Sequence, residues 1–205
     1  MAADRLLLQF SREPVPGQVK TRMIPALGEE GACQLHGELT ACTCRMLLDS
    51  QLAPVELAVA GDCDHSLFRQ LQASGVSAVW PQQGADLGLR MRHALEASLE
   101  RFHKVVLVGS DCPQLDVDYL AAAFAALERV PVVLGPAEDG GYVLLGVTQV
   151  RAQWFEGVSW GSEQVLEQTE LRLRESGSAW ERLPVRADID RPEDFALWQA
   201  IKGAG

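Results

Sequence analysis

The stretch KVVLVGSDCP, residues 104–113, contains the clearest strand signal in the sequence. Its unbroken apolar run is typical of a strand that is buried on both faces of a parallel sheet. Glycine and proline then end the strand in a turn that carries Asp111. A carboxylate at the end of a central strand can bind Mg²⁺ or Mn²⁺, because hard cations prefer oxygen ligands. A role in the turn or as a helix cap is the alternative for this residue.

Strands and helices alternate on both sides of this stretch. Apolar runs predict further strands at residues 6–10, 55–60, 76–80, 130–134, 142–147 and 182–187. Helical spacing of apolar residues predicts helices at residues 29–50, 66–74, 87–102, 117–129, 162–176 and 192–201. The alternation predicts an α/β fold, a three-layer α/β/α sandwich with a mostly parallel sheet. A length of 205 residues favours one domain, residues 1–205. Ligands of such folds bind in loops beyond the carboxyl ends of the strands.

The charge balance argues against one large class of partner. Lys and Arg number 18 and Asp and Glu number 28, which gives a net charge of −10 at pH 7. Binding to nucleic acid requires a basic face, so we expect no nucleic-acid partner. The same acidity means that a phosphate ligand would need a local cluster of cations or a metal ion.

Cysteine usage and hydropathy predict the compartment. The five cysteines form no CxxC pair, and we expect mostly buried free thiols in a reducing environment. The apolar run at residues 6–10 is too short for a signal peptide. No apolar stretch approaches the roughly 18 residues that a membrane span requires. The sequence therefore predicts a cytoplasmic protein without a membrane span. We expect the four histidines at the surface: His36, His65, His93 and His103.

The loop after the first strand, residues 11–22, carries the cations Arg12, Lys20 and Arg22 together with Gly17. Accessible backbone N–H groups and charged donors make this loop a candidate phosphate site. It is not a Walker A loop, because Lys20 follows Val19 rather than glycine. A solvated basic loop is the alternative.

Two further loops are rich in glycine. Gly84 and Gly88 would let a flat ring or a backbone approach closely, with Asp86 between them as a possible helix cap. The segment GPAEDGGY, residues 135–142, combines two acids with two glycines before Tyr142. Glu138 and Asp139 could accept hydrogen bonds from sugar hydroxyls, and a tight hairpin turn is the alternative.

The segment ADIDRPED, residues 187–194, offers a second set of carboxylates. Asp188 and Asp190 are two residues apart on an extended segment and so share a face. They could complete a metal site with Asp111. The competing interpretation is that Asp190 caps the last helix together with Glu193, with Pro192 in the first turn.

Taken in order, four stretches resemble the nucleotide-diphospho-sugar transferase (GT-A) superfamily. More narrowly, they resemble a bacterial family of small proteins, the DUF2064-type glycosyltransferases. The stretches are PVPGQVKTR (14–22), GSDCP (109–113), GPAEDGGY (135–142) and DIDRPED (188–194). WGS, residues 160–162, also resembles a turn found before a late helix in relatives. The resemblance spans nearly the whole chain and implies a Rossmann-like, nucleotide-binding fold.

The resemblance also implies roles for individual residues. Asp111 would bind Mg²⁺ or Mn²⁺, with Asp190 and Asp188 as further carboxylates, and Lys20 and Arg22 would hold the diphosphate. The residues assigned to the nucleotide are Arg12, Gly17, Lys20, Arg22, Gly84, Asp86, Gly88 and Ser110. The residues assigned to the sugar or acceptor are Glu138, Asp139, Gly140, Gly141 and Tyr142. The catalytic candidates are Lys20, Arg22, Asp111 and Asp139, where either Glu138 or Asp139 could be the general base.

Two departures from the superfamily keep several functions open. Pro113 stands where glycosyltransferases usually carry the second aspartate of Asp-any-Asp, and residues 10–14 replace the Leu-x-Gly-Gly loop of sugar-nucleotide pyrophosphorylases. The Pro-Gly-x-x-Lys-Thr-Arg pattern is similar to that of phospholactate guanylyltransferases. We expect a metal-dependent transferase that moves a sugar from a nucleotide-sugar donor to a small-molecule acceptor. Nucleotidyl transfer and nucleotide binding without turnover are the alternatives, and a homodimer is compatible with each.

Overall fold

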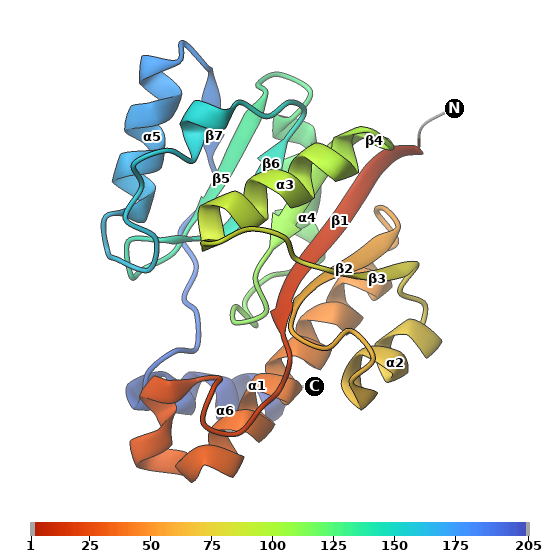
Figure 1. Cartoon of the computed structure of the whole chain (residues 1–205), viewed down its shortest axis with the longest axis vertical. Helices are drawn as coiled ribbons and strands as arrows, with labels where there is room; N and C mark the ends of the chain where they lie inside the picture. Colours follow the sequence, from red (N-terminus) through yellow and green to blue (C-terminus); the bar gives the residue numbers. More distant parts are fainter. Residues whose placement is uncertain (1–2, 204–205) are drawn as a thin grey trace.

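A seven-stranded mixed sheet carries helices on both of its faces (Figure 1), as the computed structural model of residues 3–203 shows. The strand order is β3-β2-β1-β4-β6-β5-β7. The strands are β1 (Ala3–Arg12), β2 (Val55–Ala60), β3 (Ala78–Pro81), β4 (Phe102–Val108), β5 (Val132–Pro136), β6 (Tyr142–Val147) and β7 (Trp180–Arg182). The helices are α1 (Ile24–Ser50), α2 (Ser66–Ala73), α3 (Leu87–Leu99), α4 (Val117–Ala126), α5 (Val165–Glu175) and α6 (Phe195–Gly203). Three short 3-10 turns complete the described elements: η1 (Thr21–Met23), η2 (Ala152–Trp154) and η3 (Pro192–Asp194).

The sheet is mostly parallel and separates two apolar cores. Only β6 runs antiparallel to its neighbours among the described strands. Leu7 and Val106 point into the core beneath α1, α2 and α4, whereas Leu8 and Leu107 point into the core beneath α3 and α5. Successive strand residues are therefore all buried, which explains the unbroken apolar runs. The predicted α/β/α sandwich is confirmed.

A third apolar cluster joins α6 to the first half of α1. Ile189 and Trp198 pack there against Met23, Leu35 and Leu39. Figure 1 shows α6 beside α1, at the end of an extended segment that follows β7.

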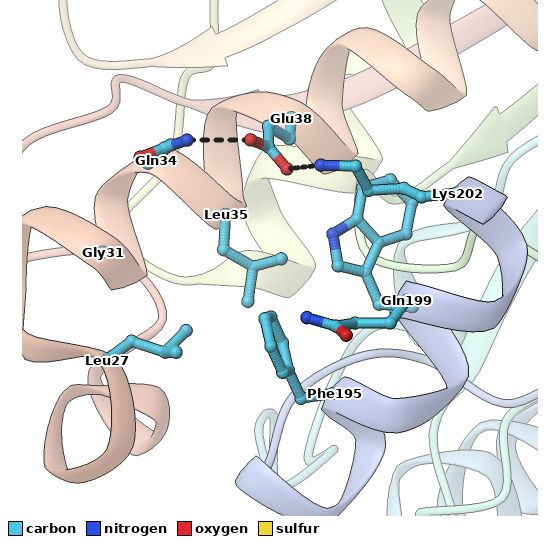
Figure 2. Close-up of a pocket in the computed structure, with 9 residues that line it drawn as sticks. Leu27, Gly31, Gln34, Leu35, Glu38, Phe195, Gln199 and Lys202 are labelled. Atoms are coloured by element: carbon cyan, nitrogen blue, oxygen red, sulfur yellow. Dashed lines mark hydrogen bonds and ion pairs between the residues drawn. The ribbon is translucent and has the colours of Figure 1, made fainter.

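Hydrogen bonds to Glu38 join α1 and α6 at the edge of the groove between them. Figure 2 shows Glu38 of α1 between Gln34 and Lys202, whose nitrogens donate to its carboxylate at 2.9 Å and 2.8 Å. The C-terminal helix is thereby held against α1.

Two predicted element boundaries are wrong. The strand predicted at residues 182–187 lies at 180–182, because Pro184 has no N–H to donate to a ladder. Beyond it, a single isolated bridge pairs Arg186 with Ala137 in the described chain. The helix predicted at residues 87–102 ends at Leu99, and Phe102 already belongs to β4.

Buried polar side chains connect β1 to the loop after β4. The Gln9 amide is fully buried and donates to the Thr40 carbonyl at 3.0 Å and to Ser110 Oγ at 2.9 Å. Ser110 Oγ in turn donates to the Phe10 carbonyl at 2.8 Å. These bonds hold the start of the Asp111 loop against β1 and α1.

Replacing Ser110 tests this connection. Ser110→Ala leaves the Gln9 amide and the Phe10 carbonyl each without one buried partner, so we expect the free energy of unfolding to fall by about 1–2 kcal/mol. Urea denaturation measures the change. Ser74→Ala, at an exposed hydroxyl that donates to Gln70 at the end of α2, is the matched control and should lose much less. Equal losses in the two variants would contradict the connection.

Candidate active site

Lys20 places a buried cation at the carboxyl end of the sheet. Its backbone is left-handed, with φ 47° and ψ 43°, and its side chain is 3% exposed. The ammonium group donates to the Ile189 carbonyl. It also lies 3.0 Å from Asp111 Oδ1 and 3.5 Å from Asp190 Oδ1. One amino group therefore connects the first loop, the β4 loop and the segment before α6.

Arg22 and Arg12 extend the positive charge outward. Arg22 pairs with the second oxygen of Asp190, yet 56% of its side chain is exposed. Arg12 is exposed and makes one long contact, 3.4 Å, to the Gln18 carbonyl. Together these groups line a pocket of about 400 Å³, here called the charged pocket. Its lining comprises Arg12, Gln18, Val19, Lys20, Thr21, Arg22, His36, Asp111 and Asp190.

His36 lies beneath this pocket, so its predicted surface position is wrong. The ring is buried, and Nε2 donates to the Arg12 carbonyl at 2.9 Å. Burial lowers the pKa of His36, partly offset by this hydrogen bond and by the charge of Asp111. The sequence held a signal for this position, because His36, Thr40, Thr43 and Leu47 follow helical spacing and are all buried in α1.

The backbone aligns the two segments that carry carboxylates. The Ile189 N–H donates to the Asp111 carbonyl at 2.8 Å, and the Ile189 side chain is fully buried in the α1–α6 cluster. Asp188 and Asp190, its neighbours on the extended segment, therefore point the other way. Burial raises the pKa of Asp188 to about 6, and the negative charge of Asp139 adds to the effect. Asp188 is thus close to the β5–β6 turn, and Asp190 to the cations.

The donor set suits a hard divalent cation held by few protein ligands. Asp111 Oδ1 is buried and accepts no hydrogen bond, because the Lys20 ammonium approaches it outside hydrogen-bond geometry. Asp190 and the Ile189 carbonyl supply further oxygens around the same point. No group of three or more His, Cys, Asp or Glu residues that could hold a metal occurs in residues 3–203. The arrangement fits Mg²⁺ or Mn²⁺ bound by one or two carboxylates, with phosphate oxygens and water as the other ligands.

The cap before α6 is made by Asp194, which corrects the predicted capping by Asp190 and Glu193. Asp194 Oδ2 accepts from the backbone N–H groups of Asp190 at 3.0 Å and Arg191 at 2.7 Å. The Asp190 side chain takes no part in this cap and faces Lys20 and Arg22 instead.

The glycine-rich loop before α3 has a structural explanation. Asp86 Oδ1 accepts from the Leu89 N–H at 2.8 Å and caps α3. A Cβ atom on Gly88 would lie 2.2 Å from Trp160 Nε1, so only glycine lets this indole pack on the helix. Neither residue lines the charged pocket, and their assignment to the nucleotide stays a prediction.

The β5–β6 turn is also tightly packed. Asp139 Oδ1 accepts from the Gly141 N–H at 2.9 Å. Gly140 has φ +86°, and a Cβ atom there would lie 2.0 Å from the Glu163 carbonyl. Asp139, Gly141 and Tyr142 line a second cavity next to the charged pocket, here called the apolar cavity. The predicted site residues that line neither space are Gly17, Gly84, Asp86, Gly88, Ser110, Glu138, Gly140 and Asp188.

The burial of His36 predicts an acid-sensitive contribution to stability. Its folded pKa lies below the ordinary 6.5, so the unfolded chain binds a proton first as pH falls. The contribution of His36 to stability is therefore fully present above the unfolded pKa of 6.5 and is lost as the pH falls from there toward the folded pKa. His36→Gln keeps an N–H donor without titrating. We expect its unfolding free energy to depend less steeply on pH, by up to about 1.4 kcal/mol per unit between roughly pH 7 and 5.

Urea denaturation across this pH range measures the two slopes. His103→Gln, at an exposed position of β4, is the matched control and should keep the wild-type slope. A wild-type slope in His36→Gln would show that the buried ring does not titrate as described.

Solved structures with the same fold include nucleotide-binding enzymes. A protein of Desulfovibrio desulfuricans G20, provisionally named a nucleotide-diphospho-sugar transferase, is 29% identical, with a TM-score of 0.81 over 92% of this chain and 83% of its own. CMP:2-keto-3-deoxy-manno-octonic acid synthetase in complex with CTP is 11% identical, with a TM-score of 0.64 over 98% and 99% of the two chains. Rv0371c of Mycobacterium tuberculosis H37Rv in complex with manganese is 13% identical, with a TM-score of 0.57 over 96% and 98%. The last two likenesses establish the fold alone.

The comparisons agree with the expected class of protein. One of these structural neighbours is named as a transferase and another as a synthetase in complex with CTP, in agreement with the expectation of an enzyme. Within residues 3–203, no helix is both long and apolar enough to cross a membrane. No curated protein sequence matches the chain significantly. The family described as "Uncharacterized protein conserved in bacteria (DUF2064)" matches residues 43–162, more than half of the chain. The chain therefore belongs to the DUF2064 family.

Proposed function

We propose that this chain is one nucleotide-binding domain that acts as a metal-dependent glycosyltransferase. The donor is a nucleotide-diphospho-sugar and the acceptor is a small molecule. The observation that carries the proposal is the charged pocket, where Lys20 and Arg22 meet the carboxylates of Asp111 and Asp190. The five free cysteines, of which Cys44 and Cys112 are buried, suit the cytoplasm that we propose as its compartment.

The charges in the pocket favour a diphosphate bound with a cation. Arg12 and Arg22 are exposed and can donate to phosphate oxygens. The Lys20 ammonium already faces two carboxylates, so it contributes little free charge until a cation joins Asp111 and Asp190. In a chain with a net charge of −10, an anionic donor needs this local concentration of positive charge.

Sugar transfer assigns a role to each group. A bound divalent cation would supply positive charge next to the diphosphate. Lys20 and Arg22 stabilise the negative charge that develops on the diphosphate as its bond to the sugar breaks. Asp139 is better placed than Glu138 to take the acceptor proton, because Asp139 lines the apolar cavity and Glu138 lines neither space.

Nucleotidyl transfer is the second candidate, favoured by the single aspartate of the Asp111-Cys112-Pro113 turn and by the Pro-Gly-x-x-Lys-Thr-Arg pattern. The same cations would then hold the β- and γ-phosphates of a nucleoside triphosphate. The two reactions release different products: a nucleoside diphosphate for sugar transfer and pyrophosphate for nucleotidyl transfer. Nucleotide binding without any product would leave a sensing or scaffolding protein.

Calorimetric titration tests the proposed site. Uridine, guanosine and cytidine diphosphates and triphosphates are titrated with and without Mn²⁺. We expect the nucleotides of one base to bind, and to bind only with the metal present. Their affinity should fall about tenfold or more in Asp111→Asn, because this variant lacks a charged metal ligand. Asp118→Asn, at an exposed aspartate in the first turn of α4, should bind as wild type.

The form of nucleotide that binds best separates the two reactions. Preference for the diphosphate favours sugar transfer, and preference for the triphosphate favours nucleotidyl transfer. Binding that ignores both the metal and Asp111 would contradict the proposed site.

A further inference from the structure

The apolar cavity lies beside the charged pocket and shares only Arg22 with it among the residues lining the two spaces. Its volume is about 270 Å³. The floor is formed by β1, β4 and β6, and the walls by the start of α3 and the residues that lead into α5. Most of the side chains that line it are apolar, among them Phe10, Leu87, Met91, Leu107, Trp160 and Val165.

The wall of this cavity is held in place. Trp160 stacks on Phe155 with ring centres 6.3 Å apart, and its indole lies against Gly88, where no Cβ would fit. Phe10, Leu107 and Val165 are buried, so the lining belongs to the packed core. An apolar cavity of about 150 Å³ in another protein binds benzene, so this one can hold a ring with substituents.

Polar groups occur at selected points of the lining. Arg22 and Asp139 lie where the cavity meets the charged pocket and the β5–β6 turn. The Tyr142 hydroxyl donates to Met91 Sδ at 4.0 Å, a weak acceptor that an occupant with an oxygen could replace. Burial raises the pKa of Tyr142 far above its usual range, so the phenol stays protonated as a donor.

We propose that the apolar cavity binds the acceptor, and that the acceptor is a small alcohol with an aromatic or branched alicyclic body. This proposal rests on the proposed sugar transfer. A nucleobase or a free sugar carries many polar groups, each costing about 1–3 kcal/mol when buried without a partner. The walls offer few such partners, whereas an apolar body gains roughly 25 cal/mol for each Å² that it buries.

The position of Asp139 completes the assignment. The alcohol oxygen forms a bond to the anomeric carbon of the donor sugar. The bond between that carbon and the diphosphate oxygen breaks, and its electron pair leaves on the nucleoside diphosphate. The hydroxyl proton passes to the Asp139 carboxylate, which lines the cavity, while Arg22 lines both spaces and faces the leaving group.

Two probes test the cavity and the charged pocket separately. Benzyl alcohol, detected by saturation-transfer NMR, reports on the apolar cavity. Pyrophosphate with Mg²⁺, followed by calorimetry, reports on the charged pocket without a base. We expect both probes to bind the wild-type chain together, and cytidine, uridine and guanosine not to displace benzyl alcohol.

Two variants should make the cavity unsuitable for an apolar ligand, one by filling it and the other by adding a charge to its lining. Val165→Phe fills it, and Leu87→Glu places a charge at a position that is 44% exposed, where the start of α3 tolerates an acid. We expect each to weaken the benzyl alcohol signal about fivefold or more and to leave pyrophosphate binding unchanged. Leu171→Phe, on the exposed side of α5, is the control and should keep both signals.

Three outcomes would overturn the proposal. These are no benzyl alcohol signal with the wild-type chain, an undiminished signal in both cavity variants, or displacement by a nucleoside, which would make the cavity a base site. If the wild-type chain binds benzyl alcohol in the cavity but does not bind pyrophosphate with Mg²⁺, the proposed sugar transfer is contradicted and the cavity remains an apolar binding site.

Discussion

The site depends on the contact between the buried ammonium group of Lys20 and the carboxylates of Asp111 and Asp190. The ammonium group is a single positive charge among two carboxylates and a carbonyl that come from segments far apart in the chain. Without it, Asp111 and Asp190 would face each other with their like charges only partly screened by solvent. The left-handed backbone of Lys20 is a cost that these partners offset. The same contact links the sheet to the segment before α6, whose Ile189 belongs to the α1–α6 core.

Two spaces of opposite chemistry meet next to this contact. The charged pocket offers cations and carboxylates for a diphosphate and a metal, and the apolar cavity offers packed side chains for a non-polar group. Arg22 lines both, so a reacting bond near Arg22 would have its leaving group on one side and its acceptor on the other. The division follows from the fold, because the loop after β1 faces one pocket while β6 and α3 enclose the other.

Sequence reasoning predicted the layers and much of the charged pocket, for physical reasons. Unbroken apolar runs and helical spacing are local signals of strands and helices. Asp111 could be predicted as a site residue because it lies in the turn that directly follows such a run. The His36 ring is buried because it meets the Arg12 carbonyl of the loop after β1, although its helical spacing with Thr40 and Thr43 already indicated the buried face of α1. The cap by Asp194 is local, but the sequence offered Asp190, Glu193 and Asp194 within five residues and did not tell which carboxylate accepts the backbone N–H groups. β7 was misplaced because the strand stops before Pro184, and the apolar cavity arises only when β1, β4, β6 and α3 come together.

A crystal of the protein soaked with Mn²⁺ and pyrophosphate tests whether Asp111, Asp190 and Lys20 hold a metal ion and a phosphate group together. Anomalous scattering at the manganese edge locates the metal without reference to any reaction. We expect a manganese peak between the carboxylates of Asp111 and Asp190, with the Lys20 ammonium moved from them onto a phosphate oxygen. A structure in which Lys20 still bridges both carboxylates, with no manganese between them, would show that these residues do not form a metal and phosphate site.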